Sequence, residues 1–196
     1  MHPDTNLKQF RVEYAFSENP AILSNNKGQV IKIAEREEKK LTKEGLTVEF
    51  NNEFDKMISK GALIELSEED CQMWRGPVHY VSLQHVYKPT SVTTPLRIVV
   101  NSSLSDRNGV SLNSILVKGP NILSNQPEVL ASFRNYEYGL CSDLTKAYHS
   151  LKTGELETHV RRVVWRYGKT KIGGGISDLK QLPSATDLLE FISISQ

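Results

Sequence analysis

The chain has 196 residues, of which 38% are hydrophobic and 24% charged, and its formal net charge is +1. This composition excludes wholesale disorder and is typical of one or two folded domains, while the balanced charge does not by itself indicate a nucleic-acid partner. The two cysteines exclude a disulfide framework, no apolar run approaches the roughly 18 residues of a membrane span, and the first residues lack a signal-peptide pattern. We therefore expect an intracellular protein, cytoplasmic or nuclear, that does not enter a membrane.

Charge is distributed unevenly along the chain. Residues 35–70 hold eleven acids and six bases, residues 75–134 hold six bases and two acids, and residues 159–171 hold five bases and no acid. This shift predicts that only part of the chain meets an anionic partner, although a solvated charged surface produces the same pattern.

The first part of the chain predicts helices. Residues 1–30 are weakly patterned, and residues 31–45 predict a charged helix. Apolar residues at helical spacing from Phe50 to Ile58 predict a second helix, which ends before Gly61.

Strands are predicted next. β-branched and aromatic residues in 78–87 and in 95–100 predict two strands, joined as a hairpin by a loop rich in Thr, Ser and Pro. A turn follows at 106–109, and Pro127 opens a short helix. The histidines lack regular metal-ligand spacing and are interpreted as ordinary polar residues.

A short apolar run then ends on Asp143, which is typical either of a helix N-cap or of a polar group placed at the end of a buried strand. Residues 160–167 predict another strand, with Arg162 and Arg166 on one face. Residues 176–196 have weak periodicity and predict at most a short helix.

In this order, the predicted elements resemble the fingers and first palm strand of a reverse transcriptase, and their amino-acid sequence is most similar to that of the Pao/BEL group of LTR retrotransposons. The segments that carry the resemblance are 85–89 (HVYKP), 96–103 (LRIVVNSS), 111–120 (SLNSILVKGP), 133–134 (FR), 142–149 (SDLTKAYH) and 163–166 (VVWR).

The resemblance implies an α+β fold, namely the fingers and an incomplete palm of the right-hand DNA/RNA polymerase fold. It divides the chain into a weakly patterned N-terminal segment with a charged helix at 1–48, a partial reverse transcriptase domain at 49–168 and a divergent tail at 169–196.

The resemblance also implies roles for single residues in nucleotidyl transfer. The family's aspartate at Asp143 is a catalytic carboxylate that ligates Mg²⁺ (or Mn²⁺), and the backbone carbonyl matching Leu144 supplies another metal ligand. The aromatic matching Tyr148 lies under the incoming sugar. Arg97 matches a contact to the triphosphate of the incoming nucleotide, for which a guanidinium is well suited, and Lys88 is a looser candidate for the same phosphates.

Each of these side chains also has a structural alternative. Tyr148 could instead be an aromatic residue packed in the core. Arg97 and Lys88 could instead be ordinary exposed residues of a strand. Arg162 and Arg166 are weak candidates for the backbone of an RNA or DNA template–primer, and a surface strand is the favoured alternative for both.

The resemblance stops before the catalytic site is complete. The family carries a second motif, an aromatic, any residue and two adjacent aspartates, but this sequence has no Asp-Asp pair, and Asp178 and Asp187 stand alone in the tail. Two-metal catalysis needs further carboxylates. We therefore expect a truncated reverse transcriptase that is inactive as an isolated chain, with the rest of a polyprotein as a further partner.

Three alternatives stay open. The chain is a nucleic-acid-binding module that uses its basic 75–134 region without catalysis, a protein-interaction domain built on the acidic helices of 35–70, or a chain that does not fold stably because half a palm leaves a sheet edge unpaired.

Overall fold

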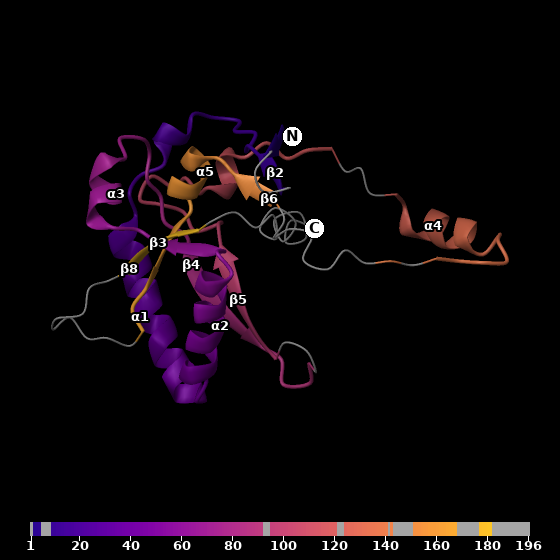
Figure 1. Ribbon diagram of the computed structural model, residues 1–196, viewed down its shortest axis with the longest axis horizontal. Helices are drawn as coiled ribbons and strands as arrows, with labels where there is room; N and C mark the ends of the chain where they lie inside the picture. Colours follow the sequence, from indigo (N-terminus) through magenta and orange to yellow (C-terminus); the bar gives the residue numbers. More distant parts are fainter. Residues whose placement is uncertain are drawn as a thin grey trace.

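The computed structural model describes residues 2–4, 9–91, 95–120, 124–140, 142, 151–167 and 177–181. Helices and strands are mixed along these ranges, which confirms the α+β class (Figure 1). The helices are η1 (Pro20–Ile22), α1 (Lys27–Glu44), α2 (Thr47–Ser59), α3 (Glu68–Met73), η2 (Asn113–Ile115), α4 (Gln126–Phe133) and α5 (Glu155–His159). The strands are β1 (His2–Asp4), β2 (Gln9–Val12), β3 (Leu63–Glu65), β4 (Ser82–Tyr87), β5 (Leu96–Asn101), β6 (Leu151–Thr153), β7 (Arg162–Trp165) and β8 (Ser177–Gln181).

The strands form three small sheets. β2 lies between β1 and β6, antiparallel to β1 and parallel to β6. β8 lies between β3 and β7 and is antiparallel to both. β4 and β5 form an antiparallel two-stranded hairpin, which packs against α1 through β4 and against α2 through β5.

The core forms where α1, α2, the hairpin and β7 meet. Leu41, Phe50 and Phe54 are completely buried, and the Trp165 ring of β7 packs against Phe50 with a centroid distance of 4.4 Å. Gly45 ends α1 with a φ of 72°, a left-handed conformation that glycine adopts at little cost, and this turn directs the chain into α2. The helical spacing of the buried phenylalanines therefore fixes which face of α2 points inward.

The weakly patterned N-terminal residues belong to the same body. Val117 donates its backbone N–H to the carbonyl of Ala15 over 2.7 Å, and Ser17 donates to the carbonyl of Ile115 over 2.8 Å. The hydroxyl of Tyr14 hydrogen-bonds the buried guanidinium of Arg161. These contacts tie the start of the chain to residues that lie about a hundred positions or more further along the sequence.

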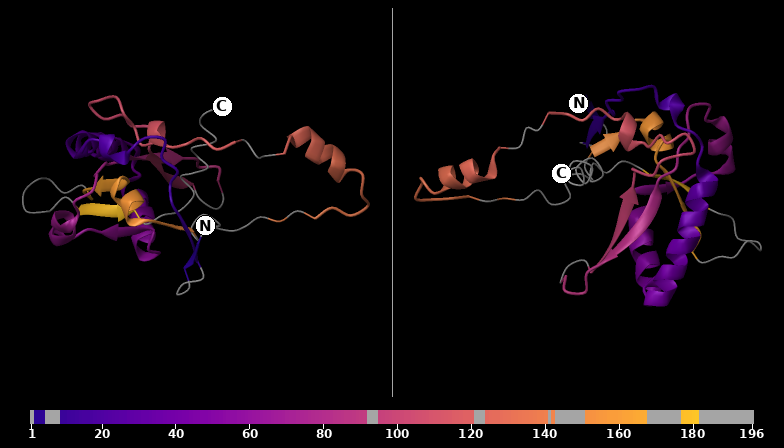
Figure 2. Two further views of the ribbon diagram at one scale, coloured as in Figure 1. Left: turned by 90° about the horizontal axis from the view of Figure 1, so that it is seen from above. Right: turned by 180° about the vertical axis from the view of Figure 1, so that it is seen from behind.

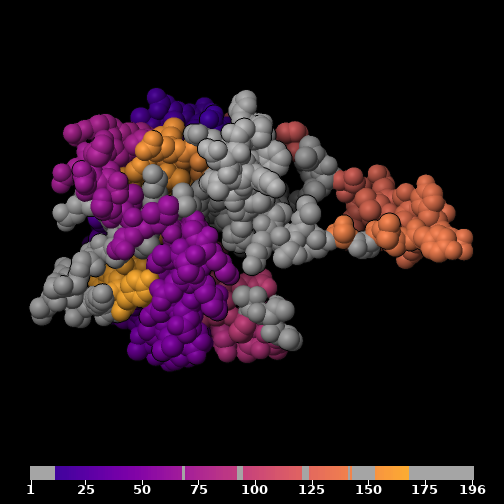
Figure 3. Space-filling view, viewed as in Figure 1, coloured from indigo at the N-terminus to yellow at the C-terminus, as the bar shows by residue number. Residues whose placement is uncertain are grey.

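One segment stands apart from the body. Residues 124–140, which include α4, project outward from the remainder of the chain in every view (Figures 1, 2 and 3). All of these side chains are exposed, with Tyr138 at 83% and Leu140 at 99% of full exposure. Pro127 lies in the first turn of α4, as predicted.

Several predicted elements differ in extent. The predicted strand at 78–87 is shorter, because the backbone of His79 bonds instead to His159 and Arg162, which leaves β4 to begin at Ser82. The predicted helix at 31–45 begins four residues earlier, at Lys27. The structure also contains α3 and β8, which the sequence patterns did not predict. Over the described ranges, no helix combines the length and apolar character that a membrane crossing requires.

Candidate functional site

The β4–β5 hairpin positions the two candidate phosphate ligands. Val86 of β4 lies directly opposite Arg97 of β5, and beyond them the N–H of Lys88 donates to the carbonyl of Pro95 over 2.7 Å. Because side chains alternate between the faces of a strand, Lys88 lies on the same face as Val86, and therefore diagonally next to Arg97. The register thus brings Lys88 and Arg97 together.

This face of the hairpin is open to solvent, whereas the other face is fixed to the helices. Lys88 and Arg97 are exposed, and within the described residues neither side chain has a hydrogen bond or an ion pair. On the opposite face, Leu83, His85 and Leu96 are buried. The two cations are therefore presented outward from a supported ribbon.

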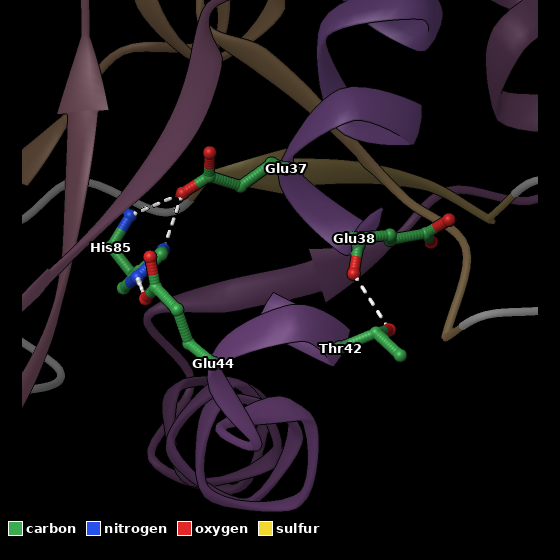
Figure 4. A network of polar contacts seen from close by, with 5 residues as sticks. All are labelled: Glu37, Glu38, Thr42, Glu44 and His85. Carbon is green, nitrogen blue, oxygen red and sulfur yellow. Dashed lines mark hydrogen bonds and ion pairs between the residues drawn. The ribbon is translucent and has the colours of Figure 1, made fainter. Parts of the chain in front are cut away.

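Two glutamates of α1 hold the buried face through His85 (Figure 4). The Nδ1 atom of His85 lies 2.6 Å from Glu37 Oε1, and its Nε2 atom lies 2.7 Å from Glu44 Oε2. The backbone N–H of His85 also donates to Glu37 Oε1 over 2.8 Å. Each ring nitrogen of His85 therefore lies within hydrogen-bond distance of one carboxylate, so a single side chain links both glutamates to the hairpin. We call these three residues the His85 clamp.

The turn after β5 is held by a buried carboxylate. Asp106 accepts hydrogen bonds from the hydroxyl and N–H of Ser24 and from the N–H groups of Asn108 and Val110. Burial alone would raise the pKa of Asp106, but these hydrogen bonds outweigh it and lower the pKa to about 2. Nearby, burial lowers the pKa of His79, whose Nδ1 lies 3.2 Å from the carbonyl of Ser24.

Arg162 points into the protein. Its side chain is buried, its Nε donates to His159 Nδ1 over 3.1 Å, and its Nη1 lies 3.6 Å from the sulfur of Cys71. The His159 ring in turn stacks on Trp74 with a centroid distance of 4.1 Å. The interpretation of Arg162 as a surface-strand residue is therefore wrong, because both faces of β7 are covered.

Arg166 is also held by the protein. Its Nη1 lies 2.5 Å from Glu35 and its Nη2 lies 3.2 Å from Glu38, both on α1. These residues line an open pocket of about 410 Å³ together with Lys39 and Thr42. Arg166 therefore ties the end of β7 to α1, and a phosphate would have to compete with two carboxylates for it.

The remaining predicted site residues, Asp143, Leu144 and Tyr148, lie outside the described residues. Over the described ranges, no cluster of three His, Cys, Asp or Glu side chains is arranged to hold a metal ion. The predicted Mg²⁺ ligands stay predictions.

No protein-family model matches the chain, and no curated protein matches it.

Sequence reasoning missed the His85 clamp. It treated His85 as an ordinary polar residue, although Glu37 and Glu44 are seven positions apart and therefore share one face of a helix. That spacing was the available signal. Which strand residue would meet the two glutamates depends on how the hairpin packs, and this is set by contacts distant in sequence.

Proposed function

We propose that the chain is the fingers and partial palm of an RNA-directed DNA polymerase of the Pao/BEL type. In this proposal the outward face of the β4–β5 hairpin binds the phosphates of an incoming nucleotide. The observation that carries it is the placement of Lys88 and Arg97 on one exposed face with no carboxylate bound to either within the described residues. A lysine and an arginine side by side provide a point charge and a planar fork for phosphate oxygens.

The rest of the catalytic site remains a proposal from the sequence. Asp143 and the carbonyl of Leu144 would ligate one Mg²⁺, and Tyr148 would pack under the sugar. Because the chain lacks an Asp-Asp pair, the isolated chain is proposed to bind nucleotide without extending a primer.

A titration with a fluorescent dATP analogue tests the phosphate site. Arg97→Gln is expected to weaken nucleotide binding by at least about tenfold, because hydrogen bonds to charged groups contribute about 1.5–3 kcal/mol each. Arg107→Gln is the matched control, since Arg107 is an exposed arginine of the turn after β5. Equal affinities in the parent chain and Arg97→Gln would refute the site.

A primer-extension assay with Mg²⁺, dNTPs and an RNA template tests the expected inactivity. We expect no extension by this chain. Robust extension that Asp143→Ala abolishes would show that the isolated chain is an active polymerase.

A further inference from the structure

Helix α1 sorts its charges onto different faces. All four of its glutamates point toward other elements and are bound there: Glu35 and Glu38 by Arg166, and Glu37 and Glu44 by His85. Glu37 and Glu38 are largely covered, with 12% and 13% of their side chains exposed, whereas Glu35 and Glu44 lie at the edges of the helix with 37% and 39% exposed. This arrangement weakens the prediction that α1 offers an acidic surface to a partner.

Five basic residues occupy the outward face of the same helix. They recur at positions i, i+4, i+7, i+8 and i+11, which is the spacing of a single helical face, and all are exposed. The residues of this α1 basic stripe are Lys32, Arg36, Lys39, Lys40 and Lys43.

The stripe is not neutralised by the described residues. Arg36 donates its Nε to the carbonyl of Lys32 over 3.2 Å, and within the described ranges none of the five side chains has an ion pair with a carboxylate. The stripe lies opposite the buried face of α1, which carries Val30, Ala34 and Leu41. Five like charges held on one rigid helix create a local positive potential that the net charge of +1 conceals.

We propose that the α1 basic stripe binds the phosphate backbone of a nucleic-acid duplex. From Lys32 to Lys43 the stripe spans about 16 Å, and a duplex carries one phosphate charge for about every 1.7 Å of its axis, so the stripe faces a dense row of negative charge along its whole length. This surface is separate from the hairpin face that carries Lys88 and Arg97, and the proposal does not depend on nucleotide binding there.

The features of α1 favour a duplex over other polyanions. The apolar face of the helix is buried in the core, so α1 cannot place it in a bilayer as a membrane-surface helix does. α1 contains no aromatic residue, and stacking on aromatic side chains is the usual means of holding single-stranded bases. The proposed contacts are to phosphates, which carry no sequence information, so binding should be independent of sequence.

The test uses fluorescence anisotropy of the full chain with a labelled duplex of arbitrary sequence, at several salt concentrations. In the stripe variant all five residues are changed to Gln: Lys32→Gln, Arg36→Gln, Lys39→Gln, Lys40→Gln and Lys43→Gln. We expect its affinity to fall at least about tenfold near 0.1 M salt. The slope of log affinity against log salt should fall by about 0.9 for each phosphate that the variant no longer binds.

A charge-matched control removes five exposed cations elsewhere: Lys56→Gln, Lys60→Gln, Arg75→Gln, Arg107→Gln and Arg134→Gln. This variant has the same net charge as the stripe variant and is expected to bind like the parent chain. Equally weakened binding in both variants would mean that binding follows net charge or the basic 75–134 region rather than the stripe, which would overturn the proposal, as would a parent chain without salt-dependent binding.

Further binding measurements distinguish a duplex from other anionic partners, and the α1 basic stripe from the hairpin face. Tighter binding of the single strand, of phosphatidylserine vesicles or of poly-glutamate, abolished in the stripe variant, would overturn the choice of a duplex. The double variant Lys88→Gln with Arg97→Gln should lose nucleotide binding and keep duplex binding, so the two proposals can fail independently.

Circular dichroism checks that each variant is folded. If the stripe variant unfolds, the double variant Lys39→Gln with Lys43→Gln is compared with the parent chain instead.

Discussion

Asp106 joins two parts of the chain that lie more than eighty residues apart. One of its oxygens accepts from the N–H and hydroxyl of Ser24 over 2.9 and 2.7 Å, and the other accepts from the N–H groups of Asn108 and Val110. The residue is 7% exposed. A single carboxylate therefore closes its own turn and fixes the segment that leads into α1.

This arrangement predicts a stability that is lost in acid. The folded-state pKa of Asp106 is about 2, below the ordinary value of 3.8, so the unfolded chain binds the proton more readily. The stabilisation is complete above about pH 4 and is lost as the pH falls toward 2, and a shift of this size corresponds to about 2 kcal/mol. Urea unfolding of the parent chain and of Asp106→Asn between pH 2 and 7 measures it.

The variant should be less stable at neutral pH and should lose part of the acid dependence. Glu13→Gln, which changes an exposed acid, is the control and should follow the parent chain. Identical pH profiles for Asp106→Asn and the parent chain would contradict the role of Asp106.

Among the elements, the β4–β5 hairpin depends on the His85 clamp for its attachment to α1. Exchanging His85 for Gln removes a ring that reaches both Glu37 and Glu44, since one amide cannot donate in both directions over that span. At least one of the two glutamates then loses its side-chain partner, although Glu37 keeps the backbone N–H of residue 85, and we expect a loss of about 0.5–1.5 kcal/mol in the free energy of unfolding.

Chemical unfolding of His85→Gln, together with hydrogen exchange of the β4 amides, measures this loss. Gln84→Ala is the neighbouring control, because Gln84 is exposed on the other face of the same strand. A His85→Gln variant as stable as Gln84→Ala would mean that the clamp does not stabilise the hairpin.

The elements also mark where sequence reasoning succeeds. The helix predicted from the apolar residues between Phe50 and Ile58 and the strand predicted at 95–100 are confirmed as α2 and β5, because a single period decides each of them. β8 escaped prediction because its pairing with β3 and β7, rather than its own pattern, makes it a strand.

The candidate site was predictable only in part. Lys88 and Arg97 fall on one face because of strand register, which the hairpin pattern implies. The burial of Arg162 and the binding of Arg166 by α1 depend on packing partners about ninety residues or more away, and no local pattern encodes them. For the same reason, counting acids and bases along 35–70 concealed the basic outer face of α1.

At the scale of the whole molecule, distant segments share one core. Residues of α1, α2, the hairpin and β7 form a single buried cluster, and the N-terminal residues reach β6 and the loop before Lys118 through backbone hydrogen bonds. A shared core favours cooperative unfolding, because no part can open without exposing the apolar surface of another. Such behaviour would exclude the alternative of a chain that does not fold stably.

The two tryptophans test this cooperativity, because they report on different surroundings. Trp165 packs among the phenylalanines of α2, whereas Trp74 stacks on His159. In Trp74→Phe and in Trp165→Phe, the one remaining tryptophan reports on its own region during urea unfolding. We expect its fluorescence midpoint to coincide with that of far-ultraviolet circular dichroism in each variant, even though Trp165→Phe lowers both midpoints by opening space in the core.

A gradual change without a midpoint would show that the chain has no stable fold. Two separated midpoints within one variant would show instead that the Trp74 region unfolds independently of the core around Trp165.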